Sequence, residues 1–86
     1  MGAVSLGSVE EYDELKLEAD RTDALYGRAE TLRLLGRWVD AVTWYRRTLD
    51  GAPSHVEALV GLAQTLTALD KHHEAEPLLR RALALR

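Results

Sequence analysis

Apolar residues recur every three or four positions along most of the chain, a spacing that places them on one face of an α-helix. From Thr22 onward this pattern predicts four helices, over residues 22–35, 38–50, 55–69 and 72–85. The residues expected on their inner faces are Leu25, Ala29, Leu32, Leu35, Trp38, Ala41, Val42, Tyr45, Thr48, Leu49, Leu59, Leu62, Ala63, Leu66, Leu69, Ala75, Leu78, Leu79, Ala82 and Leu83. No segment shows the alternation of apolar and polar residues that is typical of a half-buried strand. The pattern therefore predicts an all-α fold.

Residues with strong turn and capping preferences mark the ends of these helices. Gly36 is a natural C′ residue for the first helix, and the Gly-Ala-Pro segment at 51–53 ends the second. Ser54 and Glu57 have the spacing of a capping box, so we expect Ser54 to cap the third helix. Pro77 lies about one turn inside the last helix, where it removes a backbone donor, and it predicts a late start or a small bend.

The N-terminal residues have a different pattern. Residues 1–7 lack periodicity, and we expect them to be irregular. Ser8 and Glu11 form another capping box, which predicts a short acidic helix over residues 8–19. The polar segment 20–23 then predicts a joint before the next helix. The apolar stripe of the short helix is thin, so we expect this helix to pack against another part of the protein.

The chain contains an internal repeat, because segment 25–49 returns 34 residues later as segment 59–83. Of the 31 residue pairs that this shift aligns, 11 are identical. They are Ala24/Ala58, Leu25/Leu59, Gly27/Gly61, Ala29/Ala63, Thr31/Thr65, Leu32/Leu66, Leu35/Leu69, Ala41/Ala75, Arg46/Arg80, Arg47/Arg81 and Leu49/Leu83. A fixed period of this length is typical of repeat architectures, in which a helical unit stacks on its copy and buries a face that neither buries alone.

A 34-residue helix–turn–helix unit with small residues at fixed positions resembles the tetratricopeptide repeat. In the first unit the resemblance is carried by Leu25, Arg28, Ala29, Leu32, Gly36, Ala41, Tyr45 and Pro53. In the second unit it is carried by Leu59, Leu62, Ala63, Leu66, Ala75, Leu79 and Ala82. The alanines are small because two helix backbones cross closely there. The resemblance implies a tetratricopeptide-type α-α superhelix of two helix–turn–helix repeats, that is four helices, preceded by the short acidic helix.

The resemblance also divides the chain. We expect an N-terminal tail and acidic helix at 1–21 and a tandem-repeat domain at 22–86, made of repeat 1 at 22–55 and a truncated repeat 2 at 56–86. Arrays of this kind generally need about three units and a polar capping helix. Three possibilities follow: the chain is a segment of a longer protein, it completes its core by self-association, or the acidic helix folds back as the missing layer.

Three positions depart from the family pattern. Arg28 stands where a large apolar residue is usual, Thr48 where alanine is usual, and Asp70 where glycine is usual. Arg28 changes what covers the outer side of the first unit, and the acidic helix is a candidate partner for it.

The first helices of stacked tetratricopeptide repeats line a concave groove, so the resemblance implies a partner-binding surface there. The residues expected on it are Asp23, Tyr26, Gly27, Glu30, Arg33, Leu34, Glu57, Val60, Gly61, Gln64, Thr67 and Ala68. Glycine in a helix interior costs about 1 kcal/mol relative to alanine, so its presence at one repeat position twice, as Gly27 and Gly61, requires a reason. Either a neighbouring helix of the same protein needs the room, or a partner peptide approaches the backbone there.

Two kinds of protein partner fit these surfaces. The family's clamp for C-terminal carboxylates uses lysine and asparagine on the groove face, and neither residue occurs at these positions, so a neutral or basic amphipathic segment suits the groove better than an acidic tail. The alternative is a homo-oligomer, formed through the uncapped last helix or through an exchanged N-terminal helix. The apolar residues expected to join copies are Leu78, Leu79, Leu83 and Leu85.

Charge is distributed unevenly along the 86 residues, whose net charge is −3. Residues 1–23 carry a charge of −5 and residues 24–86 a charge of +2. Four arginines share one repeat position, namely Arg46, Arg47, Arg80 and Arg81. Such a stripe can follow phosphates, but arginines in the last turns of helices also complement the helix dipole. The acidic composition disfavours a nucleic-acid partner and favours the acidic helix as the partner of these arginines.

The sequence predicts no catalytic site, metal site or cofactor. There are no cysteines, and therefore no disulfide, thiol nucleophile or thiolate metal site. His72 and His73 are adjacent and point about 100° apart on a helix, so they do not form the i, i+4 pair that binds zinc. No serine has recognisable histidine and aspartate partners, and no glycine-rich phosphate loop occurs.

The remaining expectations concern the setting of the protein. No apolar run approaches the roughly 18 residues of a membrane-spanning helix and no signal peptide opens the chain, so we expect a cytoplasmic protein without a membrane partner. Nine of the eleven basic residues are arginine, which favours a bacterial source with a GC-rich genome. Taken with the repeat, these features predict a non-enzymatic interaction module within a larger scaffold or regulatory protein.

Overall fold

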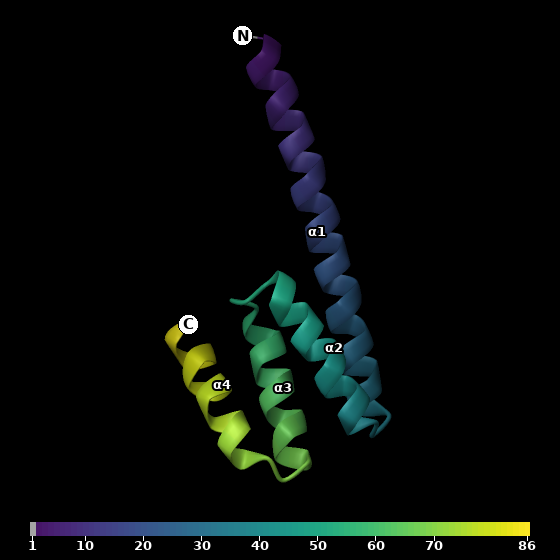
Figure 1. Cartoon of the computed structure of the whole chain (residues 1–86), viewed down its shortest axis with the longest axis vertical. Coiled ribbons are helices and arrows are strands. Elements are labelled where there is room, and N and C mark those ends of the chain that lie inside the picture. The colour runs from purple at the N-terminus through teal and green to yellow at the C-terminus, as the bar shows by residue number, and fades with distance from the viewer. Residues whose placement is uncertain (1) are drawn as a thin grey trace.

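The computed structural model describes the backbone of residues 2–86 and the side chains from Glu14 onward, and this part of the chain forms four α-helices and no strand. The helices are α1 (Gly2–Leu34), α2 (Trp38–Gly51), α3 (Val56–Ala68) and α4 (His72–Ala84). α1 packs along α2, α2 along α3, and α3 along α4, so the chain forms two stacked helical hairpins (Figure 1). The all-α hairpin fold predicted from the repeat is confirmed.

α1 is one continuous helix of 33 residues, about 50 Å long. The predicted joint at 20–23 and the separate helix over 8–19 are therefore wrong, because segment 20–23 contains no glycine or proline and its residues lower helix propensity only slightly. The prediction of irregular structure before Ser8 is also wrong for residues 2–7, which are helical. Ser8 thus does not begin a helix, and the side chains of its predicted capping box lie outside the described residues.

The N-terminal part of α1 extends away from the other three helices (Figure 1). Every side chain from Glu14 to Arg21 is exposed, including Leu15 and Leu17. The acidic segment consequently does not fold back over the repeats as a missing layer.

α1 and α3 end in the same way, at positions one repeat apart. Gly36 has a φ of +77° and Asp70 a φ of +61°, so both adopt the left-handed conformation. The bonds that close the two ends are Arg37 N–H to the Leu32 carbonyl at 2.9 Å and Lys71 N–H to the Leu66 carbonyl at 2.7 Å. These are the long hydrogen bonds of the Schellman motif. The prediction for Gly36 is confirmed, and Asp70 occupies a conformation that glycine adopts at a lower steric cost.

Of two predictions about helix starts, one is wrong and one is confirmed. The N-cap of α3 is His55 and not Ser54, since the His55 ring Nδ1 accepts a hydrogen bond from the Ala58 backbone N–H at 3.1 Å. α4 begins at His72, as predicted, and continues through Pro77. Of the two effects expected of this proline, the late start does not occur, and the small bend stays a prediction.

The core lies between the helices and is built around small residues. Its buried apolar side chains are Ala29, Ala41, Tyr45, Ala58, Leu59, Leu62, Ala63, Leu66, Ala75 and Ala82. Thr48, which replaces the family's alanine, is fully buried, and its hydroxyl donates to the Trp44 carbonyl at 2.8 Å. Four residues predicted to face inward are instead exposed, namely Leu35, Trp38, Leu79 and Leu83. They lie where no further helix covers the described chain.

Arg28 is accommodated by an aromatic ring and not by the acidic segment. Its guanidinium carbon lies 4.3 Å from the centre of the half-buried Trp44 ring, and that of Arg47 lies 4.6 Å from the same centre. A guanidinium over an indole face is favoured electrostatically and covers apolar surface with its stem. This contact explains how arginine replaces a large apolar residue here, and the predicted pairing of Arg28 with the acidic helix is wrong.

Candidate functional site

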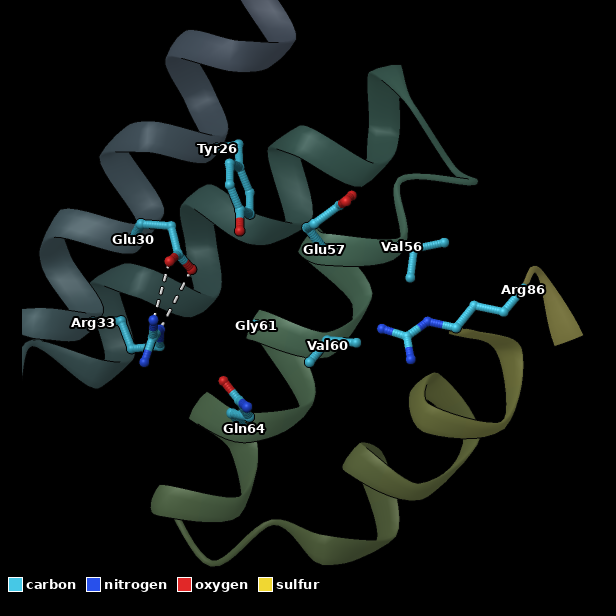
Figure 2. Close-up of a pocket in the computed structure, with 9 residues that line it drawn as sticks. All are labelled: Tyr26, Glu30, Arg33, Val56, Glu57, Val60, Gly61, Gln64 and Arg86. Atoms are coloured by element: carbon cyan, nitrogen blue, oxygen red, sulfur yellow. Dashed lines mark hydrogen bonds and ion pairs between the residues drawn. The ribbon is translucent and has the colours of Figure 1, made fainter. Parts of the chain in front are cut away.

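A hollow of about 170 Å³ opens on the face that α1 and α3 share, with the end of α4 at its side (Figure 2). Its lining residues are Tyr26, Glu30, Arg33, Val56, Glu57, Val60, Gly61, Gln64 and Arg86. Seven of these were predicted for the groove, and they come from both repeats. The predicted groove residues that do not line the hollow are Asp23, Gly27, Leu34, Thr67 and Ala68, all of which are exposed. We call this feature the α1–α3 hollow.

A hydrogen-bonded cluster of three side chains stands at one wall of the α1–α3 hollow. Arg33 forms an ion pair with Glu30 through Nη2 and Oε2 at 3.0 Å, and its Nε donates to the Tyr45 hydroxyl at 3.0 Å. The Tyr45 hydroxyl in turn donates to Glu30. Tyr45 belongs to α2, so the cluster ties the second helix of repeat 1 to the groove face of the first.

The protonation states of this cluster are fixed by its surroundings. Burial raises the pKa of Tyr45, and its hydrogen bond to the Glu30 carboxylate raises it further. Burial also opposes ionisation of Glu30, but hydrogen bonds from Arg33 and Tyr45 outweigh it and hold the pKa of Glu30 below its ordinary value. The pKa of Arg33 is raised by its hydrogen bonds to Glu30 and Tyr45. The cluster therefore holds one negative and one positive charge that neutralise each other.

The two repeat-related glycines have different surroundings. Gly61 is buried, and a Cβ added there would lie 2.6 Å from two ring carbons of Tyr45 and 2.7 Å from its hydroxyl. A Cβ added at Gly27 would meet nothing within 4 Å. Gly61 thus makes room for a side chain of its own protein, which is the first of the two explanations considered above. No internal contact requires glycine at position 27.

Next to this cluster, the lining of the hollow combines an aromatic ring with an acidic side chain. The Tyr26 ring centre lies 4.9 Å from that of His55 and 6.1 Å from that of Tyr45. Partial burial raises the pKa of Tyr26, and the negative charges of Glu30 and Glu57 raise it further, so the phenol remains protonated. The Glu57 side chain is 70% exposed. Figure 2 shows the Tyr26 ring between Glu30 and Glu57.

The sequence did not point to three residues at the hollow. Val56 lies one helical turn before Val60, so extending the predicted face by one turn would have included it. Tyr45 was predicted as a core residue, and its ring is indeed buried, but its hydroxyl reaches the groove face. The signal for this contact was the pairing of a large residue in α2 with a glycine in α3. Arg86 carried no sequence signal.

A second, more apolar hollow of about 300 Å³ adjoins the first, and both share Val60 and Arg86. Its other lining residues are Leu79, Ala82 and Leu83. Of the residues predicted for self-association, Leu79 and Leu83 line this hollow. Leu85 is exposed but is not part of its lining, and Leu78 is partly buried against the core.

The arginines at the shared repeat position each have a separate partner. Arg46 forms an ion pair with Glu74 at 3.2 Å, and Arg81 donates to the Pro53 carbonyl at 2.7 Å. Arg80 pairs with Glu76 within α4, and Arg47 stacks on Trp44 as described above. These partners account for all four side chains without a phosphate.

The histidines and acids do not gather into a metal-binding arrangement in the part of the chain whose side chains are described, where no three of them lie close enough to hold an ion. His72 instead contacts the Asp70 carboxylate, with 2.8 Å between Nε2 and Oδ1. Among the same residues, no helix combines the length and the apolar character needed to cross a membrane.

Comparison with protein families gives a match. The family described as tetratricopeptide repeat matches residues 20–86. This range includes α2, α3, α4, the part of α1 from Asp20 onward and the whole α1–α3 hollow. No curated protein matches the chain.

Proposed function

Since the chain belongs to the tetratricopeptide repeat family, we propose that it is a non-enzymatic protein-interaction module that binds a helical or extended peptide segment in the α1–α3 hollow. The family's typical role is interaction with other proteins. The observation that carries the proposal is the meeting of seven predicted groove residues, from two repeats, around one hollow. We further propose that the module serves a larger scaffold or regulatory protein in the cytoplasm.

The hollow has the properties that a peptide site needs. It offers an aromatic ring and an apolar side chain, Tyr26 and Val60, beside hydrogen-bonding groups such as the exposed Gln64 amide. Its wall is held rigid by the Glu30–Arg33–Tyr45 cluster, so a ligand need not order these side chains on binding. A partly apolar concave surface with a few fixed polar groups is typical of ligand sites.

The proposal is tested by capture of partner proteins on the immobilised chain, with one variant in the hollow and one outside it. Val60→Gln removes apolar surface from the hollow, and Val39→Gln makes the same change at an exposed position on α2. We expect Val60→Gln to lose proteins that both the unaltered chain and Val39→Gln retain. Equal retention by all three would rule out the hollow as the binding surface. Circular dichroism of each variant checks that the helices persist.

Self-assembly is the second candidate, and a specific feature favours it. The extended part of α1 and the last helix both leave apolar side chains exposed, with Leu15 at 66% and Leu83 at 71%. We propose as the alternative that copies of the chain join through these surfaces, either at Leu78, Leu79, Leu83 and Leu85 or by exchange of the N-terminal part of α1. Light scattering over a range of concentrations tests it, and a monomer throughout would remove this candidate.

A further inference from the structure

Of the four charged residues that line the α1–α3 hollow, two neutralise each other. Glu30 and Arg33 are paired with each other and with the Tyr45 hydroxyl, as described above. A ligand that competed for either would have to break a charge-assisted cluster, which is costly in a partly buried site. The recognition of a ligand's charge therefore depends on the other charged residues at the rim.

Glu57 is the acid at the rim whose charge is available. The His55 Nδ1 lies 3.6 Å from the Glu57 Oε2. That nitrogen accepts the hydrogen bond from the Ala58 N–H, so it carries no proton and cannot donate to the carboxylate. Within the described part of the chain, Glu57 consequently has no cationic partner.

A second acid occupies the equivalent place in the first repeat. Asp23 lies 34 residues before Glu57, is exposed, and also forms no ion pair with a described residue. Glu57 lies in the first turn of α3, where an acid is stabilised by the helix dipole. Asp23 lies far inside the continuous α1, where this explanation does not apply. The two acids therefore share a groove position and not a helix-capping role.

The Tyr26 ring lies beside Glu57, and the two form one end of the hollow (Figure 2). An aromatic face attracts a cation, and an adjacent carboxylate strengthens this attraction. At the other side the Arg86 side chain points toward Val60 and would repel a cation there (Figure 2). A cation is thus attracted to the end of the hollow formed by Tyr26 and Glu57 and repelled from the side where Arg86 lies.

We infer that the α1–α3 hollow recognises a lysine or arginine side chain of the bound peptide, held by the Glu57 carboxylate against the Tyr26 ring. This inference rests on the peptide-binding function proposed above and specifies its ligand. Along α3 the next groove residues are Val60 and Gln64, one and two turns further on. The basic residue is therefore followed along the groove by an apolar contact and then by a hydrogen bond to the Gln64 amide.

The test uses three synthetic peptides that differ at one central position. Each is acetylated, amidated and amphipathic, with leucines on one face, and the central residue is arginine, citrulline or glutamate. Citrulline keeps the shape of arginine and removes its charge. Affinity is measured by isothermal titration, and the binding surface by shifts of backbone amide signals in NMR spectra. Two variants accompany the unaltered chain: Glu57→Gln, and Glu14→Gln as a matched change of an exposed acid on the extended part of α1.

We expect the arginine peptide to bind about five to ten times more tightly than the citrulline peptide, with shifts at Glu57, Val60 and Gln64. Glu57→Gln should abolish this preference, and Glu14→Gln should retain it. Equal binding of all three peptides at these residues would overturn the cationic recognition while leaving peptide binding in place. Preference for the glutamate peptide would overturn it as well. Absence of any shift in the hollow would count against the peptide-binding function itself.

Discussion

Gly27 and Gly61 occupy the same repeat position, so replacing each with alanine makes the same change at two equivalent helical sites with different neighbours. A methyl group at position 27 meets no atom within 4 Å. A methyl group at position 61 lies 2.6 Å from two Tyr45 ring carbons, far inside the roughly 3.5–4.0 Å separation that carbon atoms prefer. We expect the two substitutions to change stability in opposite directions.

The expected magnitudes follow from two effects. Alanine is favoured over glycine in a helix interior, so Gly27→Ala should stabilise the protein by about 0.5–1 kcal/mol. Gly61→Ala gains the same amount, but overpacking a buried contact costs about 1–3 kcal/mol. The Tyr45 ring cannot move aside freely, because it is fully buried and its hydroxyl is held by Glu30 and Arg33. Gly61→Ala should therefore destabilise the protein by about 1–2 kcal/mol net.

Urea unfolding followed by far-ultraviolet circular dichroism measures both changes. Two further proteins, Tyr45→Leu alone and Tyr45→Leu combined with Gly61→Ala, isolate the contact. Leucine is chosen because it is the residue at the equivalent position 79 in repeat 2. In that background Gly61→Ala should cost about 1 kcal/mol less than in the unaltered chain. If both single alanine variants gained stability equally, Tyr45 would not pack on Gly61 and the described junction between the repeats would be wrong.

Three further predictions concern capping, backbone strain and charge. His55→Ala should lower the free energy of unfolding by about 0.5–2 kcal/mol, because it removes the α3 cap. Ser54→Ala should change it by less than about 0.5 kcal/mol, and urea unfolding of both variants compares the two effects. Asp70→Gly should stabilise the protein by up to about 1 kcal/mol, seen as a higher melting temperature, because Asp70 has a positive φ. The pKa of Glu30 in the folded protein lies below its ordinary value of 4.5. The ionised carboxylate therefore stabilises the fold at pH values above 4.5, and this stabilisation is lost as the pH falls through the lower, folded-state pKa. The stability difference between the unaltered chain and Glu30→Gln should shrink from about pH 5 to about pH 3, and an unchanged difference would contradict the hydrogen bonds assigned to Glu30.

The helices and their stacking could be predicted because they depend on periodic features of the sequence. Alanines recur where helix backbones cross, at positions such as Ala29 and Ala63, and each is buried in the structure. Gly36 marked the end of α1 through its conformational freedom. These signals concern spacing and residue size, which the sequence shows directly.

The joint at 20–23 was mispredicted for an identifiable reason. Polar residues that favour helix starts also occur inside helices at a small cost, and only glycine or proline would have forced a break. The α3 cap was misassigned by one residue. His55 accepts the capping hydrogen bond from the Ala58 N–H, and histidine is not among the residues that usually cap helices.

For the site, the sequence could predict which residues share a surface but not which side chains contact one another. Helical spacing placed Tyr26, Glu57 and Val60 on one face, and the structure brings them to one hollow. The sequence could not show that the Tyr45 hydroxyl joins Glu30 and Arg33, because this contact depends on how α2 crosses between α1 and α3. Nor could it show that the Tyr45 ring fills the space beside Gly61, whereas the space beside Gly27 is open.

We propose that the α1–α3 hollow is the surface that contacts a partner protein. Photo-crosslinking in cells of the source organism tests it most directly, with a benzoylphenylalanine in place of Gln64 at the hollow or in place of Thr43, which is exposed on α2. We expect crosslinked partner protein from position 64 and little from position 43. Equal crosslinking from both positions, or crosslinking from position 43 alone, would contradict it.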